Sequence, residues 1–191
     1  MQKITIISQY FHPHHGATSQ LMTDLAKGFS HLGYTINIFT GSQSKQTTPE
    51  PLNTININRA FSLIKSSTSI YSKIFSSIFF LLAALWYVIF SIPPNTTLLI
   101  ASNPPYAGLL GICFRIIHRG KYHFLLQDIF PESAVMSGIM KPKSILYEFF
   151  SNLIYLTYKY AEYIIVLSTS MQEFIEKKHP DLKYKIKVIE N

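Results

Sequence analysis

The chain has 191 residues, which is enough for one domain with a hydrophobic core and too few for two domains of ordinary size. Hydrophobic residues make up 48% of it and charged residues only 14%, which excludes a disordered chain. Its net charge of +7 favours an anionic partner, but its aromatic residues lie mostly among aliphatic ones, which argues against nucleic acid. The single cysteine excludes an internal disulfide framework.

The N-terminal part of the chain predicts a strand, a helix and a second strand. Residues 3–8 ("KITIIS") are apolar and β-branched on both faces, as in a buried strand. Apolar residues then recur at helical spacing from an N-cap at Thr18 or Ser19 to Gly33, where a positive φ is expected. Residues 34–41 ("YTINIFTG") follow as a strand. This order predicts parallel strands joined by a right-handed crossover.

Further strands follow along the chain, with apolar helical segments between most of them. After a polar loop at 42–53, we expect strands in the segments 54–58 ("TININ"), 98–102 ("LLIAS"), 122–127 ("YHFLLQ"), 163–168 ("YIIVLS") and 185–190 ("KIKVIE"). The pattern predicts an α/β fold in one domain, residues 1–191, with a Rossmann-like, doubly wound and mostly parallel sheet.

The chemically interesting residues all follow predicted strands. They lie at 12–18, 103–106, 128–132 and 169–170, and each group follows one of the strands named above. Open parallel sheets bind their ligands at the carboxyl ends of the strands. The sequence therefore places a candidate site at this edge of the sheet.

The loop "HPHHGATS" (12–19) has three interpretations. A metal site would use His12, His14 and His15, but the last two are adjacent and would diverge. A phosphate or sugar cradle would use Gly16, Ala17 and Thr18, since glycine permits close approach and a helix N-terminus offers free N–H groups. The third interpretation is a plain connecting turn. No G-x-G-x-x-G follows the first strand, which argues against a dinucleotide-binding dehydrogenase.

Residues 73–94 form an apolar segment that predicts contact with a membrane. No charged residue or histidine occurs from Ile74 to Phe114, and the segment is long enough to span a bilayer. A span would divide one sheet between two sides of the membrane, so we expect a helix that packs in the fold and partly faces lipid through Phe79, Phe80, Trp86 and Phe90. Nearby cations that could meet anionic headgroups are Arg59, Lys65 and Lys73.

Four segments resemble family-4 glycosyltransferases. They are "ISQYFHPHHGATSQLMTDLAKGFSHLGYTINIFTG" (7–41), "ASNPPYAGLLG" (101–111), "LLQDIFPESAVMSG" (125–138) and "AEYIIVLSTSMQEFI" (161–175). The third is similar to the D-L-W-P-E-S signature of a bacterial branch that builds surface polysaccharides and includes fucosamine transferases. The resemblance implies the N-terminal, acceptor-binding half of a GT-B enzyme, with the C-terminal donor-binding domain absent from the chain.

The resemblance also implies roles for individual residues. Asp128 would lie near the acceptor hydroxyl and the anomeric carbon, where a carboxylate can take a proton or stabilise positive charge; alternatively it caps the turn before Pro131. The acceptor-binding set would be His12, Asn103, Tyr106, Glu132 and Ser170, with Glu132 alternatively orienting backbone or Lys141. The donor phosphate or sugar loop would be Gly16, Ala17 and Thr18.

The sequence thus predicts the acceptor side of a retaining glycosyltransferase in cell-surface glycan biosynthesis. Its partners would be a nucleotide-sugar, shared with a missing domain or partner chain, a lipid-linked or oligosaccharide acceptor, and a membrane surface; no metal or other cofactor is expected. The alternatives are a non-catalytic membrane-associated subunit and an α/β binding module that recruits a donor-binding protein. Because the N-terminus lacks signal-peptide features, we expect a cytoplasmic location, peripheral to the membrane.

Overall fold

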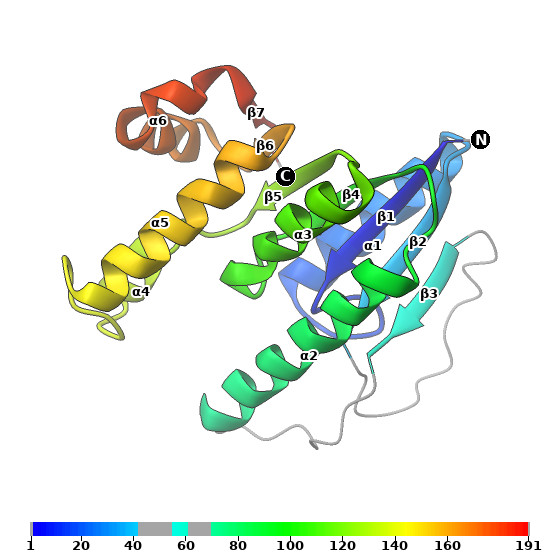
Figure 1. Ribbon diagram of the computed structural model, residues 1–191, viewed down its shortest axis with the longest axis horizontal. Helices are drawn as coiled ribbons and strands as arrows, with labels where there is room; N and C mark the ends of the chain where they lie inside the picture. The colour runs from blue at the N-terminus through cyan, green and yellow to red at the C-terminus, as the bar shows by residue number, and fades with distance from the viewer. Residues whose placement is uncertain (1, 42–54, 61–69, 191) are drawn as a thin grey trace.

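The computed structural model describes residues 2–41, 55–60 and 70–190, which contain one sheet of seven parallel strands (Figure 1). The strand order is β3-β2-β1-β4-β5-β6-β7, and every neighbouring pair is parallel. The strands are β1 (Lys3–Ser8), β2 (Thr35–Thr40), β3 (Ile55–Arg59), β4 (Thr96–Ala101), β5 (Tyr122–Leu126), β6 (Tyr163–Val166) and β7 (Ile186–Val188). This confirms the predicted doubly wound, Rossmann-like α/β fold.

Helices connect the strands and cover the sheet unequally. They are α1 (Ala17–His31), α2 (Ile70–Phe90), α3 (Gly108–His118), α4 (Glu132–Met136), α5 (Ile145–Tyr160) and α6 (Thr169–Lys178), with short 3₁₀ turns η1 (Pro105–Ala107) and η2 (Pro180–Lys185). On one face of the sheet, the larger core joins strand residues to α2, α3 and α5. On the other face, the smaller core joins them to α1.

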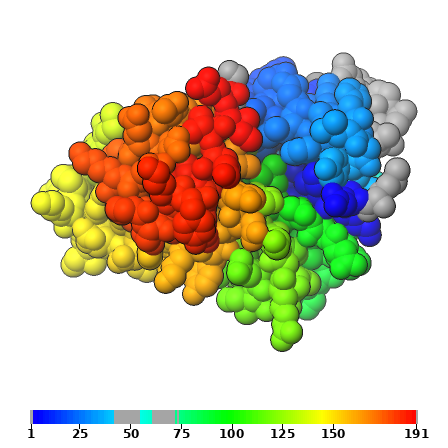
Figure 2. All heavy atoms as spheres, turned by 90° about the horizontal axis from the view of Figure 1, so that it is seen from above, coloured from blue at the N-terminus to red at the C-terminus, as the bar shows by residue number. Residues whose placement is uncertain are grey.

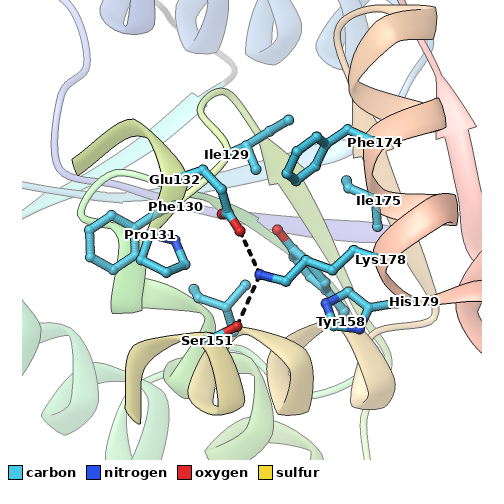
Figure 3. A pocket seen from close by; sticks show the side chains of 11 residues that line it. Ile129, Phe130, Pro131, Glu132, Ser151, Tyr158, Phe174, Ile175, Lys178 and His179 are labelled. Atoms are coloured by element: carbon cyan, nitrogen blue, oxygen red, sulfur yellow. Dashed lines mark hydrogen bonds and ion pairs between the residues drawn. The ribbon is translucent and has the colours of Figure 1, made fainter. Parts of the chain in front are cut away.

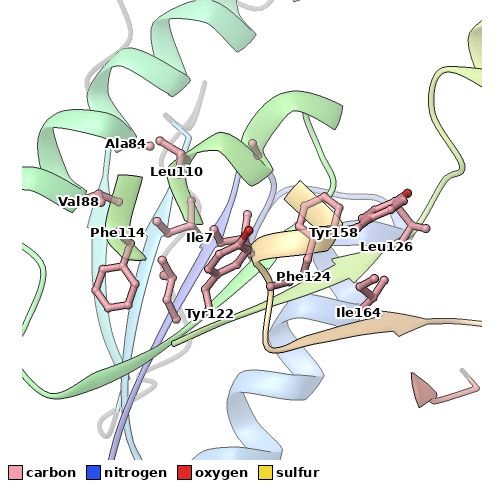
Figure 4. Packing of buried hydrophobic residues seen from close by; sticks show 14 of the residues in the cluster. Ile7, Ala84, Val88, Leu110, Phe114, Tyr122, Phe124, Leu126, Tyr158 and Ile164 are labelled. Atoms are coloured by element: carbon pink, nitrogen blue, oxygen red, sulfur yellow. The ribbon is translucent and has the colours of Figure 1, made fainter. Parts of the chain in front are cut away.

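The larger core consists of side chains that alternate along the strands and recur at helical spacing (Figure 4). Phe124 of β5 and Ile164 of β6 are completely buried beside Tyr158 of α5. Tyr122 is also completely buried, and its hydroxyl donates to the Thr157 carbonyl at 2.7 Å. Burial raises the pKa of both tyrosine hydroxyls, so they stay neutral.

The start of the first helix differs from the prediction. Helix α1 begins at Ala17, and its N-cap is Gly16, with φ of 151° and no capping side chain, rather than Thr18 or Ser19. Thr18 is already inside the helix, where its hydroxyl donates to Gln127, and Ser19 is buried. The predicted positive φ of Gly33 is confirmed at 86°. At the other end of the chain, η2 takes up Lys185, so the last strand is shorter than predicted.

Helix α2 packs one side on the sheet, as predicted. Of the four side chains that were expected to face lipid, however, one is buried, so the prediction for it is wrong. Phe80 is only 3% exposed, because it shares the sheet-facing side of the helix with Ala84 and Val88 and packs against Phe39 of β2. Phe79, Trp86 and Phe90 do face outward, together with Phe75, Ile78 and Leu82. Among the described residues, no helix meets the length and hydropathy that a membrane span requires. Lys65 lies outside the described residues, and the same holds for the side chain of Lys73.

The α1 face of the sheet carries an apolar groove beside that helix. The groove has a volume of about 410 Å³ and runs between α1 and the residues that follow β6 and β7. Figure 2 shows these C-terminal residues next to the N-terminal part of the chain. The lining is mainly Leu21, Leu25, Phe29, Leu99, Leu125, Ile165, Leu167 and Ile189. His123 also lines it; burial lowers the pKa of its imidazole, and its Nδ1 has no hydrogen-bond partner among the described residues.

Candidate functional site at the carboxyl edge of the sheet

The strand order reverses between β1 and β4, and we call the region outside their carboxyl ends the crevice, after the position at which open α/β sheets bind ligands. From β1 the chain builds outward to β2 and β3, and it then returns to place β4 on the other side of β1. The helices that follow these two strands leave from opposite faces of the sheet, α1 with the smaller core and α3 with the larger one. Ligands of open α/β sheets bind at such a reversal.

The loop after β1 lies on one side of this region. Gly16 is exposed, and a Cβ at its position would meet no atom within 4 Å. The first turn of α1 has no acidic residue, and no side chain caps it. Its first N–H groups therefore have no capping side chain and lie at the positive end of the helix dipole, which is the arrangement that binds phosphate or other anions. Ala17 is likewise exposed, so Gly16 and Ala17 leave room for a ligand.

The loop after β4 lies on the other side. The Gln9 amide donates to the Asn103 carbonyl at 3.4 Å, which joins the two loops across the reversal. The side chain of Gln9 is buried and accepts a hydrogen bond from Ser77 of α2 at 3.2 Å. Ser77 also hydrogen-bonds the hydroxyl of Tyr106, whose pKa is raised by burial despite that bond. Asn103 and Tyr106 are thus fixed beside the loop that carries His12.

Asp128 lies directly beyond this pair of loops. The Gln127 amide donates to the Ser102 hydroxyl at 2.9 Å, and the Gln127 side-chain oxygen accepts from the Thr18 hydroxyl at 3.1 Å. These bonds tie the end of β5 to the end of β4 and to the start of α1. The Asp128 side chain is exposed and accepts no hydrogen bond within the described part of the chain. It caps no turn there, because the N-cap of α4 is Pro131 without a side-chain bond.

Glu132 lies outside this arrangement and has a partner that the sequence did not indicate (Figure 3). Its carboxylate forms an ion pair with Lys178 of α6, with N and O 2.5 Å apart, and accepts from the Tyr147 hydroxyl at 2.9 Å. Lys178 also donates to Ser151 at 3.0 Å. Burial lowers the pKa of Lys178, but its bonds to Glu132 and Tyr147 more than offset this and raise it. Glu132 therefore joins α4 to α5 and α6, and its partner is Lys178 rather than Lys141.

His12 is held in the crevice loop through its backbone. The guanidinium of Arg59, at the end of β3, donates to the His12 carbonyl at 2.6 Å, and the Thr23 hydroxyl accepts from the His12 amide at 3.3 Å. Burial lowers the pKa of Arg59. Within the described ranges, no three His, Cys, Asp or Glu side chains are grouped so that they could hold a metal ion.

The structure thus brings together most of the predicted residues, with two exceptions. His12, Gly16, Thr18, Asn103 and Tyr106 surround the reversal, and Asp128 adjoins them through Gln127. Ser170 is exposed in the first turn of α6, which follows β6, and β6 is separated from β4 by β5. Its hydroxyl lies 2.9 Å from that of Ser168. Glu132 is the second exception.

Sequence reasoning missed the polar residues that join the loops. Gln9, Ser102 and Gln127 each end or follow a predicted strand, and each bonds a neighbouring loop. Their position was a usable signal, because a polar side chain directly after a buried strand lies at the carboxyl edge. Their partners could not be predicted, since these depend on which strands are neighbours.

Comparison with known proteins shows the fold. No protein-family profile and no curated protein matches the sequence. The structure is similar to sucrose-phosphate synthase from Thermosynechococcus elongatus, with a TM-score of 0.68 and 13% sequence identity. The similarity covers 100% of this chain and 48% of the synthase, so the chain spans about half of that protein's length. The chain therefore has a glycosyltransferase-like fold.

Proposed function

We propose that this chain is the acceptor-binding half of a retaining glycosyltransferase, one that uses a nucleotide-sugar and acts in cell-surface glycan biosynthesis. The observation that carries the proposal is the reversal of strand order between β1 and β4, with the predicted site residues gathered around it, on a glycosyltransferase-like fold. An open helix N-terminus on one side and an exposed carboxylate beyond the other are groups that bind phosphate and activate a hydroxyl. The retaining mechanism and the role in cell-surface glycan biosynthesis are proposed from the resemblance of the sequence to family-4 glycosyltransferases.

In this proposal the residues of the crevice have separate tasks. The N–H groups at Gly16, Ala17 and Thr18 bind a phosphate or sugar of the donor. His12, Asn103 and Tyr106 line the acceptor pocket. Asp128 accepts the proton of the attacking acceptor hydroxyl or stabilises the positive charge that develops on the sugar ring. Because Asp128 is exposed beside the crevice, an acceptor can reach it without a change of fold.

The second half of the enzyme, a donor-binding domain or partner chain, would supply most contacts to the nucleotide diphosphate. The apolar groove beside α1 supports this part of the proposal, because its leucine, isoleucine and phenylalanine side chains form a surface that a second domain can bury. We propose that the donor-binding half covers the groove. The acceptor would be lipid-linked or an oligosaccharide, and the outward side of α2 would rest on the cytoplasmic membrane surface.

Calorimetry with UDP- and GDP-sugars tests the half-enzyme proposal. We expect weak or undetectable binding to residues 1–191 alone, and binding that appears once a donor-binding half is added. The added half should also produce sugar transfer to a lipid-linked acceptor. Micromolar affinity of the isolated chain for any of these donors would contradict the proposal, because the chain would then hold the diphosphate by itself.

A further inference from the structure

The connection between α4 and α5 presents an apolar surface that no described residue covers. We define the α4–α5 tip as residues 136–149; Figures 1 and 2 show it at one far end of the molecule. Five of its large apolar side chains are between 54% and 92% exposed: Met136, Ile139, Ile145, Leu146 and Phe149. A group of exposed apolar side chains of this kind marks an interaction site.

The tip is an ordered structure rather than a loose loop. The amides of Ile139 and Met140 both donate to the Ala134 carbonyl, at 3.0 and 3.1 Å. Helix α5 then starts with Ser144 as its N-cap, whose hydroxyl accepts from the Tyr147 amide at 3.2 Å. The ion pair of Glu132 with Lys178 fixes the base of the tip to α6. The apolar side chains therefore point outward because the backbone holds them there.

The charges on the tip indicate the kind of partner. Lys141 and Lys143 are exposed between the apolar side chains, and no acidic residue occurs from Ser133 to Tyr147. The acidic residue of the tip is Glu148, close to its C-terminal end. Lysine is depleted in protein interfaces, whereas apolar side chains among lysines are typical of segments that enter an anionic lipid surface. The combination favours a membrane over another protein.

We infer that the α4–α5 tip inserts into the anionic surface of a membrane, as a contact additional to α2. The tip follows β5, so it lies at the same edge of the sheet as the crevice. Its insertion turns that edge toward the bilayer. The inference rests on the proposed function in one respect, namely that the chain binds a lipid-linked acceptor at the membrane surface.

Single-tryptophan variants test the inference, because the chain contains only one tryptophan, Trp86. Trp86→Phe provides a background without tryptophan. Into it we would place Ile145→Trp in the tip, Phe75→Trp in α2, or Ile116→Trp near the end of α3 as the control. All three positions are well exposed, at 92%, 64% and 73%, so the fold should tolerate the change. The probe is vesicles of phosphatidylglycerol and brominated phosphatidylcholine.

We expect the Ile145→Trp variant to shift its emission to the blue and to be quenched by the brominated lipid, and the Ile116→Trp variant to do neither. Quenching of the Phe75→Trp variant without quenching of the Ile145→Trp variant would overturn the inference and leave the α2 contact standing. No binding in any variant would overturn both contacts. If the emission of the Ile145→Trp variant shifts to the blue without lipid, and more so at higher protein concentration, the tip binds a second copy of the chain. That result would overturn the inference.

The two lysines of the tip give an independent measurement in the wild-type background. Lys141→Gln and Lys143→Gln should each weaken vesicle binding about fivefold at low salt. Lys187→Gln, an exposed lysine of β7, is the matched control and should leave the binding unchanged. Equal effects of all three would indicate general attraction to anionic lipid rather than insertion of the tip. Failure here leaves the sugar-binding test of the proposed function unaffected, since that test uses no lipid surface.

Discussion

Asp128 and Glu132 lie four positions apart in one connection, and their surroundings differ. The Asp128 carboxylate is exposed beside the crevice, whereas the Glu132 side chain is only 19% exposed and bonds Lys178 and Tyr147. A carboxylate that already accepts such bonds joins the helices and is a poor candidate for proton transfer. An exposed carboxylate without a partner in the described residues can accept a proton from an acceptor hydroxyl.

The first prediction follows from the exposure of Asp128. In the enzyme completed by its donor-binding half, Asp128→Asn should lower turnover by about 10²- to 10⁴-fold, the usual effect of removing an acid–base group. Its melting temperature should not change, because no bond to the described residues is lost. Turnover and melting are measured on one preparation, with Asp24→Asn, an exposed aspartate of α1, as the control. Earlier melting with normal turnover would make Asp128 a structural residue.

The second prediction concerns the ion pair of Glu132 with Lys178. Glu132→Gln should destabilise the chain by about 1–3 kcal/mol in urea unfolding, because a partly buried ammonium loses its charged partner. Glu162→Gln, which breaks the exposed pair with Lys121, is the control and should have little effect. Equal effects of the two substitutions would show that burial of the Glu132 pair is unimportant.

The same pair predicts a pH dependence. The folded-state pKa of Lys178 is raised above its ordinary value, so its contribution to stability is complete below that value and is lost as the pH rises through the folded pKa. Stability should therefore fall above about pH 10.4, the ordinary pKa of lysine. In urea unfolding at a series of pH values, the free energy of unfolding of Lys178→Met should fall less steeply at alkaline pH than that of the wild type. If both proteins lose stability equally at alkaline pH, groups other than Lys178 cause the loss.

At the scale of elements, close packing of α3 sets the position of one side of the crevice. Gly108 and Gly111 lie one turn apart on this helix; Gly108 faces Thr157 of α5, and Gly111 faces the ring of Tyr122. The absence of side chains lets α3 approach both neighbours closely. Because η1 leads directly into α3, this approach also positions Tyr106 at the reversal.

The element-scale prediction is that Gly111→Ala destabilises the fold by about 1–3 kcal/mol. A Cβ there would collide with the Tyr122 ring, which is completely buried and held by its bond to Thr157. The control is Gly28→Ala in α1, where a Cβ would meet no atom within 4 Å; it should stabilise the helix by about 0.5–1 kcal/mol. Urea unfolding of both variants measures the difference. Stabilisation by Gly111→Ala would mean that α3 is not closely packed.

At the scale of the whole molecule, the two faces of the sheet differ in how they are covered. The face under α2, α3 and α5 carries the larger core, whereas the face under α1 keeps an apolar groove of about 410 Å³. The structure matches about half of a longer protein, and the proposed donor-binding half would bury this groove.

Ile189 provides the test of this proposal. It lines the groove and is 55% exposed, so Ile189→Asp should preserve the melting temperature. The charge would be buried on association, and affinity for the donor-binding half should fall at least about tenfold, which corresponds to roughly 1.4 kcal/mol. Ile116→Asp, at an exposed position of α3 outside the groove, is the control. Unchanged affinity of the Ile189 variant would place the second half elsewhere.

The order and type of most elements could be predicted from the sequence, and so could the position of the polar clusters after the strands. Periodicity is a local property, so strands such as 3–8 and 122–127 could be read directly. It also identified His12, Gly16, Thr18, Asn103, Tyr106 and Asp128 as neighbours at one edge, because parallel strands share that edge. The adjacency of β1 and β4, which defines the reversal, could not be predicted because it depends on long-range strand pairing.

Tertiary structure also decided the partners of individual side chains. Glu132 pairs with Lys178, 46 positions along the chain, because α6 returns to pack beside α4 and α5. Phe80 enters the core while Phe79 stays outside, since successive positions on α2 point in different directions and the sheet lies on one side only. Such contacts depend on distances between segments that are remote in sequence, and neither propensity nor spacing contains those distances.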